Sequence, residues 1–206
     1  MSLVGTSKIK RAVDVVVSLT GIVVLSPLFV LLILILKLDS GPTVFAHPRV
    51  GRNRVVFRCY KLRTMHTDAE QRLAELLSKN AEAKLEWDTH FKLKEDPRIT
   101  TLGKVLRKSS LDELPQLFNV LRGDMSLVGP RPVVEEELKL YGEYTADYLS
   151  TRPGITGLWQ VSGRNDLDYD ERVTLDTTYV RQWSHALDFR ILLKTVRVVL
   201  THRGAY

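Results

Sequence analysis

The sequence predicts an α+β protein, mostly helical with one small β-hairpin, that is attached to a membrane near its N-terminus. Three observations support this expectation. Residues 15–36 form an apolar run without a charge, residues 43–64 hold β-prone segments around a turn, and later segments repeat apolar residues at helical spacing. This combination of elements is typical of an α+β fold.

The composition favours an anionic partner. The chain has 206 residues, 44% of them hydrophobic, which is enough for one core, and its formal charge is +6. Such an excess of cations suits phosphate, a lipid surface or nucleic acid. Cys59 is the one cysteine, so an internal disulfide is excluded, and no Cys/His cluster has the spacing of a zinc site.

The apolar run at 15–36 has two interpretations. It is longer than the core of a signal peptide and no small-x-small cleavage site follows it. Pro27 cannot donate to the carbonyl of Val23, so a kink is expected there, and Ser26 can bind the freed carbonyl. Both flanks are basic, and basic flanks prefer the cytoplasm, so a helix that enters, bends and returns competes with a kinked single span.

The next segments are read from turn and cap signals. Val44–Ala46 and Val55–Cys59 are predicted strands, with a turn at 51–53 between them. Residues 67–86 are predicted as one solvated amphipathic helix that begins with a capping box formed by Thr67 and Glu70.

The remaining segments alternate loops and helices. A turn at Asp96-Pro97 precedes a short basic helix that ends near residue 108, and 123–132 and 151–165 are expected to be Gly/Pro-rich loops. The basic amphipathic helix at 187–201 can lie on an anionic bilayer or pack in the core.

Asp112 and Glu113 stand together at the start of a predicted helix. Ser110 and Glu113 form a capping-box pattern, but Pro115 favours an N-cap near Asp112. Adjacent helical side chains point about 100° apart, so the two acids are expected to have different roles. Acids at a helix start can also simply offset the helix dipole.

The surroundings of this acidic pair favour chemistry on phosphate. Many cations are near it in sequence: Arg98, Lys104, Arg107, Lys108, Arg122 and Arg131. Carboxylates and substrate phosphates together bind Mg²⁺, and an Asp carboxylate can be a phosphoryl nucleophile. Two adjacent acids cannot readily flank a sugar from opposite sides, which argues against a glycosidase.

Four stretches carry a resemblance to a known family: KLRTM (61–65), DPRIT (96–100), LRKSSLDELPQLFNVLRGDMSLVGPRP (106–132) and RPGITGLWQVSGRN (152–165). In order and spacing they closely resemble the bacterial sugar transferases, which are small monotopic phosphoglycosyl transferases. The resemblance runs from about residue 8 to the C-terminus, and the chain looks like the short form without extra N-terminal membrane helices.

The resemblance implies a monotopic protein on the cytoplasmic face of the bacterial inner membrane. Residues 1–40 would form a re-entrant helix-break-helix with its break at Ser26 and Pro27. Residues 41–206 would form a cytoplasmic catalytic domain with interfacial amphipathic helices.

The resemblance also implies a reaction. Asp112 and Glu113 would be a catalytic dyad that requires Mg²⁺. Asp112 would attack the sugar-bearing phosphorus of a UDP-sugar, release UMP and pass a hexose-1-phosphate to polyprenyl (undecaprenyl) phosphate. This is a first membrane step of exopolysaccharide, capsule or O-antigen assembly.

The resemblance further assigns phosphate contacts to Arg107 and Arg131, and also to Lys61 and Arg63. The rigid frame of Pro130 and Pro132 around Arg131 supports its assignment, because it reduces the entropy lost on clamping a phosphate. Trp159 is expected in the core.

The expected partners are a UDP-sugar, polyprenyl phosphate, membrane lipid and, from the relatives, a second copy in a homodimer. Nucleic acid is not expected, because no recognition helix or RNA-binding aromatic pattern is present. The alternative is a membrane-anchored basic scaffold or nucleic-acid-binding protein without catalysis. The closing residues 203–206 favour galactose or glucose as the sugar.

Overall fold

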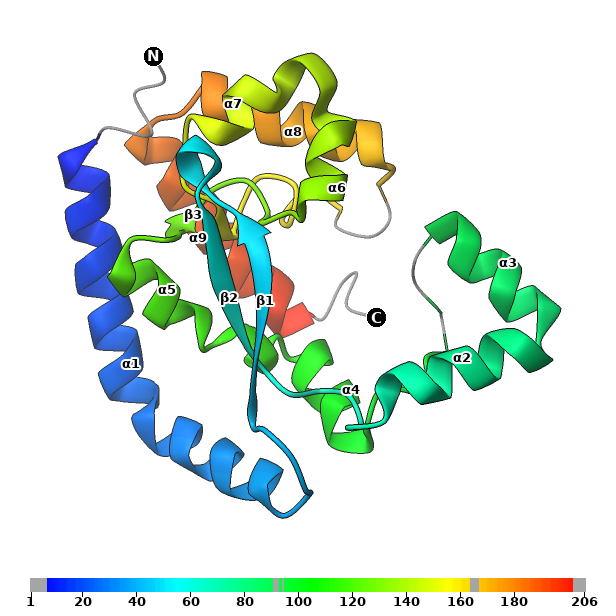
Figure 1. Cartoon of the computed structure of the whole chain (residues 1–206). Helices are drawn as coiled ribbons and strands as arrows, with labels where there is room; N and C mark the ends of the chain where they lie inside the picture. The colour runs from blue at the N-terminus through cyan, green and yellow to red at the C-terminus, as the bar shows by residue number, and fades with distance from the viewer. Residues whose placement is uncertain (1–6, 91–92, 94, 164–166, 202–206) are drawn as a thin grey trace.

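The protein is mostly helical and contains two small sheets, as the computed structural model shows for residues 7–90, 93, 95–163 and 167–201 (Figure 1). Arg164, Asn165 and the closing residues 203–206 lie outside these ranges. The longer elements, in chain order, are α1 (Lys8–Lys37), β1 (Val44–Val50), β2 (Val56–Leu62), α2 (Ala69–Lys79), α3 (Ala81–His90), α4 (Thr101–Lys108), α5 (Gln116–Arg122), α8 (Tyr169–Arg181) and α9 (His185–Thr201). Short elements lie between them: η2 (Arg52–Arg54), η3 (Leu111–Glu113), β3 (Ser126–Val128), α6 (Glu135–Leu138), η4 (Lys139–Tyr144), α7 (Thr145–Leu149) and β4 (Gly154–Thr156).

Helix α1 is continuous through Pro27, and it changes direction part-way along its length (Figure 1). The hydroxyl of Ser26 donates to the carbonyl oxygen of Val23 at 2.8 Å. This is the carbonyl that Pro27 cannot reach, because proline has no backbone N–H. The predicted role of Ser26 at the proline is therefore confirmed.

The first turns of α1 are attached to the body by buried polar contacts. Lys10 Nζ donates to the carbonyl of Val128 at 2.9 Å and to Asp188 Oδ2 at 2.7 Å. Asp14 accepts from the hydroxyl of Ser126 and the backbone N–H of Leu127. These contacts fix the N-terminal end of α1 against β3 and α9.

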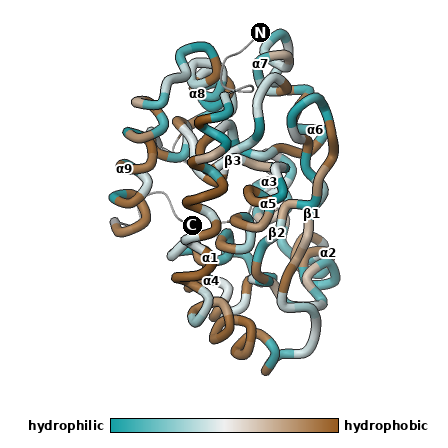
Figure 2. Tube along the Cα trace, turned by 90° about the vertical axis from the view of Figure 1, so that its left-hand side faces the viewer, coloured by the Kyte–Doolittle hydropathy of each residue, from teal (hydrophilic) through white to brown (hydrophobic). Residues whose placement is uncertain are grey.

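The rest of α1 leaves large apolar side chains exposed, among them Leu19, Val24 and Leu34. Figure 2 shows hydrophobic stretches along both α1 and α9. By length and composition, α1 is the one helix of the described residues that could cross a membrane.

The predicted hairpin is confirmed, with longer strands than expected. β1 and β2 pair antiparallel, from Val44 opposite Leu62 to Val50 opposite Val56. The turn uses left-handed backbone at Asn53 and Arg54, with φ of 55° and 63°. The side chain of Asn119 on α5 then fastens β2 from outside the hairpin: it accepts from the N–H of Tyr60 and donates to the carbonyl of Arg58.

Two predicted loops in fact contain short β-strands. The predicted loops 123–132 and 151–165 contribute β3 and β4, a parallel pair in which Ser126 lies opposite Gly154. A Cβ on Gly154 would lie 2.1 Å from the backbone of Gly129, so glycine permits this close approach. Strands of three residues are too short to show the alternation of apolar and polar residues that predicts a strand.

The predicted helix 67–86 is in fact two helices, because α2 ends at Lys79 and Asn80 has extended backbone. The expected cap at Thr67 is replaced by Asp68 at the N-cap position, without a side-chain hydrogen bond. Asn80 explains the break, since its side chain accepts from the N–H of Ala83 and so starts α3. Figure 1 shows both helices projecting from the body.

The core joins the hairpin, α5, β3 and the C-terminal helices. Its largest cluster contains Phe57, Val120, Met125, Tyr179 and Ile191. The predicted C-terminal helix is confirmed as α9 and contributes Ile191 to this core, while Leu193 and Val196 stay exposed. α9 therefore packs one face and leaves an apolar face outward.

We predict that Asn119→Ala lowers the free energy of unfolding by about 2–4 kcal/mol, because two backbone groups of β2 lose their partner inside the fold. A thermal or denaturant unfolding curve measures this loss. Asn80→Ala is the matched control on an exposed helix cap, with an expected loss of about 1 kcal/mol. Equal losses in the two variants would contradict the bracing role of Asn119.

Candidate functional site

Asp112 and Glu113 lie in η3, a 3-10 turn that precedes α5. The expected α-helix with an N-cap near Asp112 is therefore wrong, and the alternative capping box at Ser110 does not form. Ser110 has left-handed backbone, with φ of 58°, and its side chain makes no cap hydrogen bond. α5 begins only at Gln116, with Pro115 at the N-cap position, where a missing N–H costs nothing.

Asp112 is a buried carboxyl surrounded by charges. It is 7% exposed, and burial raises its pKa to about 6. The ammonium of Lys61 and the guanidinium of Arg107 oppose that rise in pKa, and the carboxylate of Glu113 adds to it. Cations from other parts of the chain thus lower the pKa of Asp112 and favour its carboxylate form.

Lys61, on β2, joins the two acids. Its Nζ lies 2.7 Å from Glu113 Oε1 and 3.9 Å from Asp112 Oδ2. The ammonium thus occupies a position where both carboxylates favour positive charge. Arg107, on α4, is oriented by a 3.0 Å hydrogen bond from its Nε to Thr64 Oγ1.

A small open pocket adjoins this turn. Lys61, Glu113 and Arg131 are among the residues that line it. The guanidinium of Arg131 lies over the ring of Trp159, 5.6 Å from its centroid. Trp159 is 7% exposed, so its predicted place in the core is confirmed.

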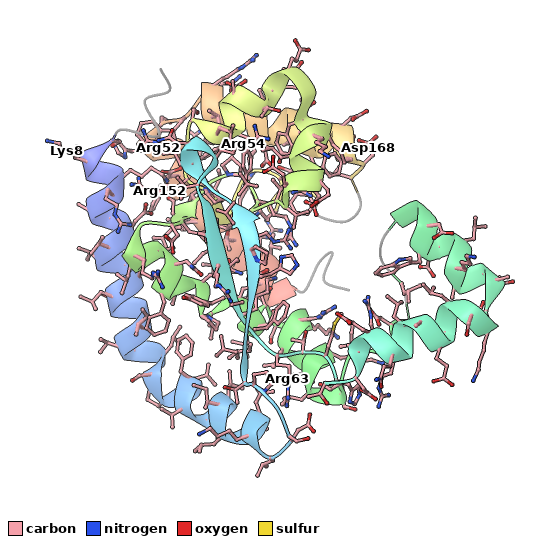
Figure 3. All side chains as sticks on the ribbon, in the orientation of Figure 1. Lys8, Arg52, Arg54, Arg63, Arg152 and Asp168 are labelled. Atoms are coloured by element: carbon pink, nitrogen blue, oxygen red, sulfur yellow. The ribbon has the colours of Figure 1, made fainter. Side chains whose placement is uncertain are left out.

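Arg63 lies elsewhere, near the loop that follows α1 (Figure 3). Its guanidinium donates to the carbonyls of Leu36, Asp39 and Ser40, and it pairs with the Asp39 carboxylate at 3.0 Å. Of the predicted phosphate contacts, Lys61 and Arg107 interact with Asp112, and Arg131 shares a pocket with Glu113. Arg63 instead holds the C-terminal end of α1.

Three further polar residues line the pocket without having been singled out from the sequence: Arg49, Gln116 and Gln160. Gln116 could have been found, because it follows Asp112 by one helical turn. Arg49 comes from the other strand of the hairpin and Gln160 from the segment after β4, so only the tertiary fold brings them here.

The site offers two carboxylates to a cation. Within 7–90, 93, 95–163 and 167–201, no three His, Cys, Asp or Glu side chains converge as a metal cluster. Mg²⁺ commonly takes one or two protein carboxylates and completes its shell with water and substrate phosphate. Asp112 and Glu113, which already share the ammonium of Lys61, fit a site of that kind.

The chain is similar to known sugar transferases. A family model described as bacterial sugar transferase matches residues 5–202. The chain is 53% identical to an uncharacterized sugar transferase of Haemophilus influenzae and 52% identical to the undecaprenyl-phosphate galactose phosphotransferase of Salmonella typhimurium, with 96% of this chain covered in each case. It is 50% identical to the exopolysaccharide production protein ExoY of Sinorhizobium fredii over 96% of this chain and 88% of ExoY. The chain spans 42% of the length of each of the first two relatives.

We predict that Asp112→Asn stabilises the protein at pH 7.5 in the presence of a chelator. The raised pKa means that the stability contributed by the protonated carboxyl is complete below 3.8 and is lost as the pH rises through about 6. The asparagine variant avoids this loss, so its advantage reaches at most about 3 kcal/mol above pH 7 and disappears below pH 4.

Unfolding curves of both proteins between pH 4 and 8 measure this difference. Asp147→Asn is the matched control, because Asp147 forms a surface ion pair with Arg181 and should show no such pH-dependent gain. An Asp112→Asn variant that is less stable than the native protein at pH 7.5 would contradict the burial argument.

Proposed function

The chain belongs to the bacterial sugar transferase family, and from this premise we propose that it transfers a hexose-1-phosphate from a UDP-sugar to polyprenyl phosphate, releasing UMP. The observation that carries the proposal is a buried carboxyl, Asp112, whose charge Lys61 and Arg107 offset, beside Glu113, which lines a pocket together with Lys61 and Arg131. Asp14 is also buried, but it accepts hydrogen bonds that attach α1 to β3, whereas Asp112 adjoins a pocket. This difference favours the enzyme over a scaffold.

In the proposed first step, a carboxylate oxygen of Asp112 attacks the sugar-bearing phosphorus. An acyl–phosphate bond forms, the bond from that phosphorus to the UMP oxygen breaks, and UMP leaves with the electron pair. In the second step, an oxygen of polyprenyl phosphate attacks the same phosphorus and the carboxylate leaves. One set of cations thereby serves two anionic substrates in turn, so their mutual repulsion is avoided.

Each cation has a separate part in this proposal. Lys61 and Arg107 lower the cost of the charged form of Asp112, and Arg131 offers a planar set of donors to a phosphate. Mg²⁺, which we propose binds Asp112 and Glu113, would neutralise charge on the phosphate oxygens. Glu113 then exchanges its ion pair with Lys61 for that cation.

We further propose that the protein is monotopic, with residues 1–40 as a re-entrant anchor and residues 41–206 as the catalytic domain, on the cytoplasmic face of the bacterial inner membrane. α1 supports an anchor, because only 17% of its most apolar window is buried. α9 supports an interfacial helix, because Phe189, Leu193, Val196 and Leu200 are exposed at helical spacing along one face.

The names of the relatives guide the choice of substrates. The Salmonella relative is named for undecaprenyl phosphate and galactose, and a relative from Komagataeibacter xylinus, 39% identical, for undecaprenyl phosphate and glucose. We propose undecaprenyl phosphate as the acceptor and one of these hexoses in the donor, within exopolysaccharide, capsule or O-antigen assembly. A homodimer remains part of the proposal.

We predict that Asp112→Asn lowers the rate of UMP release by a factor of about 10³ or more, because the nucleophile is lost. The assay supplies UDP-galactose or UDP-glucose, Mg²⁺ and undecaprenyl phosphate. Without the acceptor, the native protein should release one UMP per site and keep label from the sugar phosphate, whereas the variant should do neither.

Asp147→Asn is again the control and should keep native activity. The proposal is overturned if the native protein releases no UMP from any UDP-hexose or UDP-N-acetylhexosamine. It is also overturned if Asp112→Asn turns over at the native rate.

We predict that both ends of α1 lie on the cytoplasmic side, because Lys10 binds its N-terminal end to the body and Arg63 binds its C-terminal end. Single cysteines at Lys8 or Lys37, in a Cys59→Ser background, report this through an impermeant maleimide applied to intact spheroplasts. Neither position should react from outside.

Permeabilised spheroplasts are the control, because both exposed positions should react there. Labelling of position 8 in intact spheroplasts would refute the re-entrant anchor and would leave the proposed chemistry untouched.

A further inference from the structure

Arg131 is a guanidinium at the pocket that contacts an aromatic ring. Within the described part of the chain, no carboxylate lies at ion-pair distance from it. The buried carboxyl of Asp176 interacts with its charge and accepts a hydrogen bond from its backbone N–H, but forms no ion pair with its side chain. The contact that the structure gives the Arg131 side chain is the face of Trp159.

This form of support matters for an anion site. A carboxylate partner would neutralise the guanidinium and occupy its in-plane N–H donors. The face of an indole attracts the cation through its quadrupole and leaves those donors directed outward. Arg131 therefore keeps both its charge and its hydrogen-bonding edge available at the pocket.

The Trp159 ring is itself held in place by neighbouring side chains. The guanidinium of Arg172, on α8, lies 5.1 Å from the centroid of the Trp159 ring and 5.0 Å from that of Tyr169. Arg172 is 8% exposed, and its ion pair with Glu137 ties α8 to α6. The indole nitrogen of Trp159 has no hydrogen-bond partner among the described atoms, so the ring face is the part that makes specific contacts.

The backbone around Arg131 is fixed as well. The N–H of Gly154 donates to the carbonyl of Pro130 at 2.8 Å, and Val133 pairs with Val50 on β1. Backbone anchors on both sides leave the side-chain torsions as the main freedom of Arg131. The contact with Trp159 restricts that freedom.

We propose that Trp159 is a positioning residue for Arg131: by a cation–π contact it holds the guanidinium at the pocket, ready to bind the phosphoryl group of the sugar donor. This inference rests on the proposed function, because it takes the donor to be the ligand of Arg131. Its strength depends on the π electrons of the ring and not on the size or the N–H of the side chain.

The sharpest experiment changes only those electrons. Tryptophan analogues with one to four fluorine atoms, placed at position 159 by site-specific incorporation, withdraw π electron density and nearly preserve shape. We expect kcat/KM for the UDP-sugar to fall stepwise with fluorine number, to a total of about 3- to 20-fold, mainly through a higher KM. A flat series overturns the proposal, and the test needs no variant that could fail to fold.

A mutant cycle gives a second measurement. Trp159→Phe keeps an aromatic face and should stay within about 3-fold of native kcat/KM, while Trp159→Met should lose about 5- to 30-fold. In an Arg131→Ala background, Trp159→Met should have no further effect, because the group that it positions is absent. Equal losses in both backgrounds would show a merely structural role and overturn the inference.

Tyr144→Leu is the matched control, since it removes a cation–π contact with exposed Arg181 on the surface and should leave KM unchanged. The two proposals fail differently. If the native protein releases no UMP, the proposed function fails. If it is active but indifferent to the electronics of residue 159, only the positioning role fails.

Discussion

The structure depends on one electrostatic constraint: a carboxylate, Asp112, is buried where its charge must be offset. A 3-10 turn cannot do this alone, because its own neighbour Glu113 is also an acid. Lys61 arrives from the hairpin and Arg107 from α4, so the pairing of β1 with β2 and the docking of α4 both serve the ionisation of one side chain. Burying this charge lowers the stability of the fold, and the buried residue, Asp112, is the one on which the proposed chemistry depends.

A second set of contacts connects that turn to α1. α1 is held at its N-terminal end by Lys10 and at its C-terminal end by Arg63, whose guanidinium binds the last carbonyls of the helix. Between these ends, Phe29 packs edge-on against Phe118 at 6.1 Å, and Phe118 belongs to α5, directly after the acidic turn. The apolar helix and Asp112, the proposed nucleophile, therefore belong to one connected framework, which would set the height of the site above a bilayer.

The cations Lys61, Arg107 and Arg131 are supported in different ways, and the differences suit different tasks. Lys61 is bound by carboxylates and Arg107 by a hydroxyl, whereas Arg131 rests on an aromatic face. The first arrangement offsets negative charge inside the protein. The last leaves positive charge for a ligand, which is the property that an anionic donor requires.

The sequence by itself determined the local elements and the types of residue that make up the site. Pro27 with Ser26, the hairpin around residues 51–53 and the acidic pair beside Pro115 are signals carried by a few neighbouring residues, and each led to the correct element or the correct part of the chain. Only the tertiary structure decided that Ser110 adopts left-handed backbone, that two glycine-rich loops pair as buried strands, and that Arg63 binds α1 while Trp159 supports Arg131. These outcomes depend on contacts between residues far apart in the chain, whose free energies are set by burial and by neighbouring charge, and no local pattern of residues encodes them.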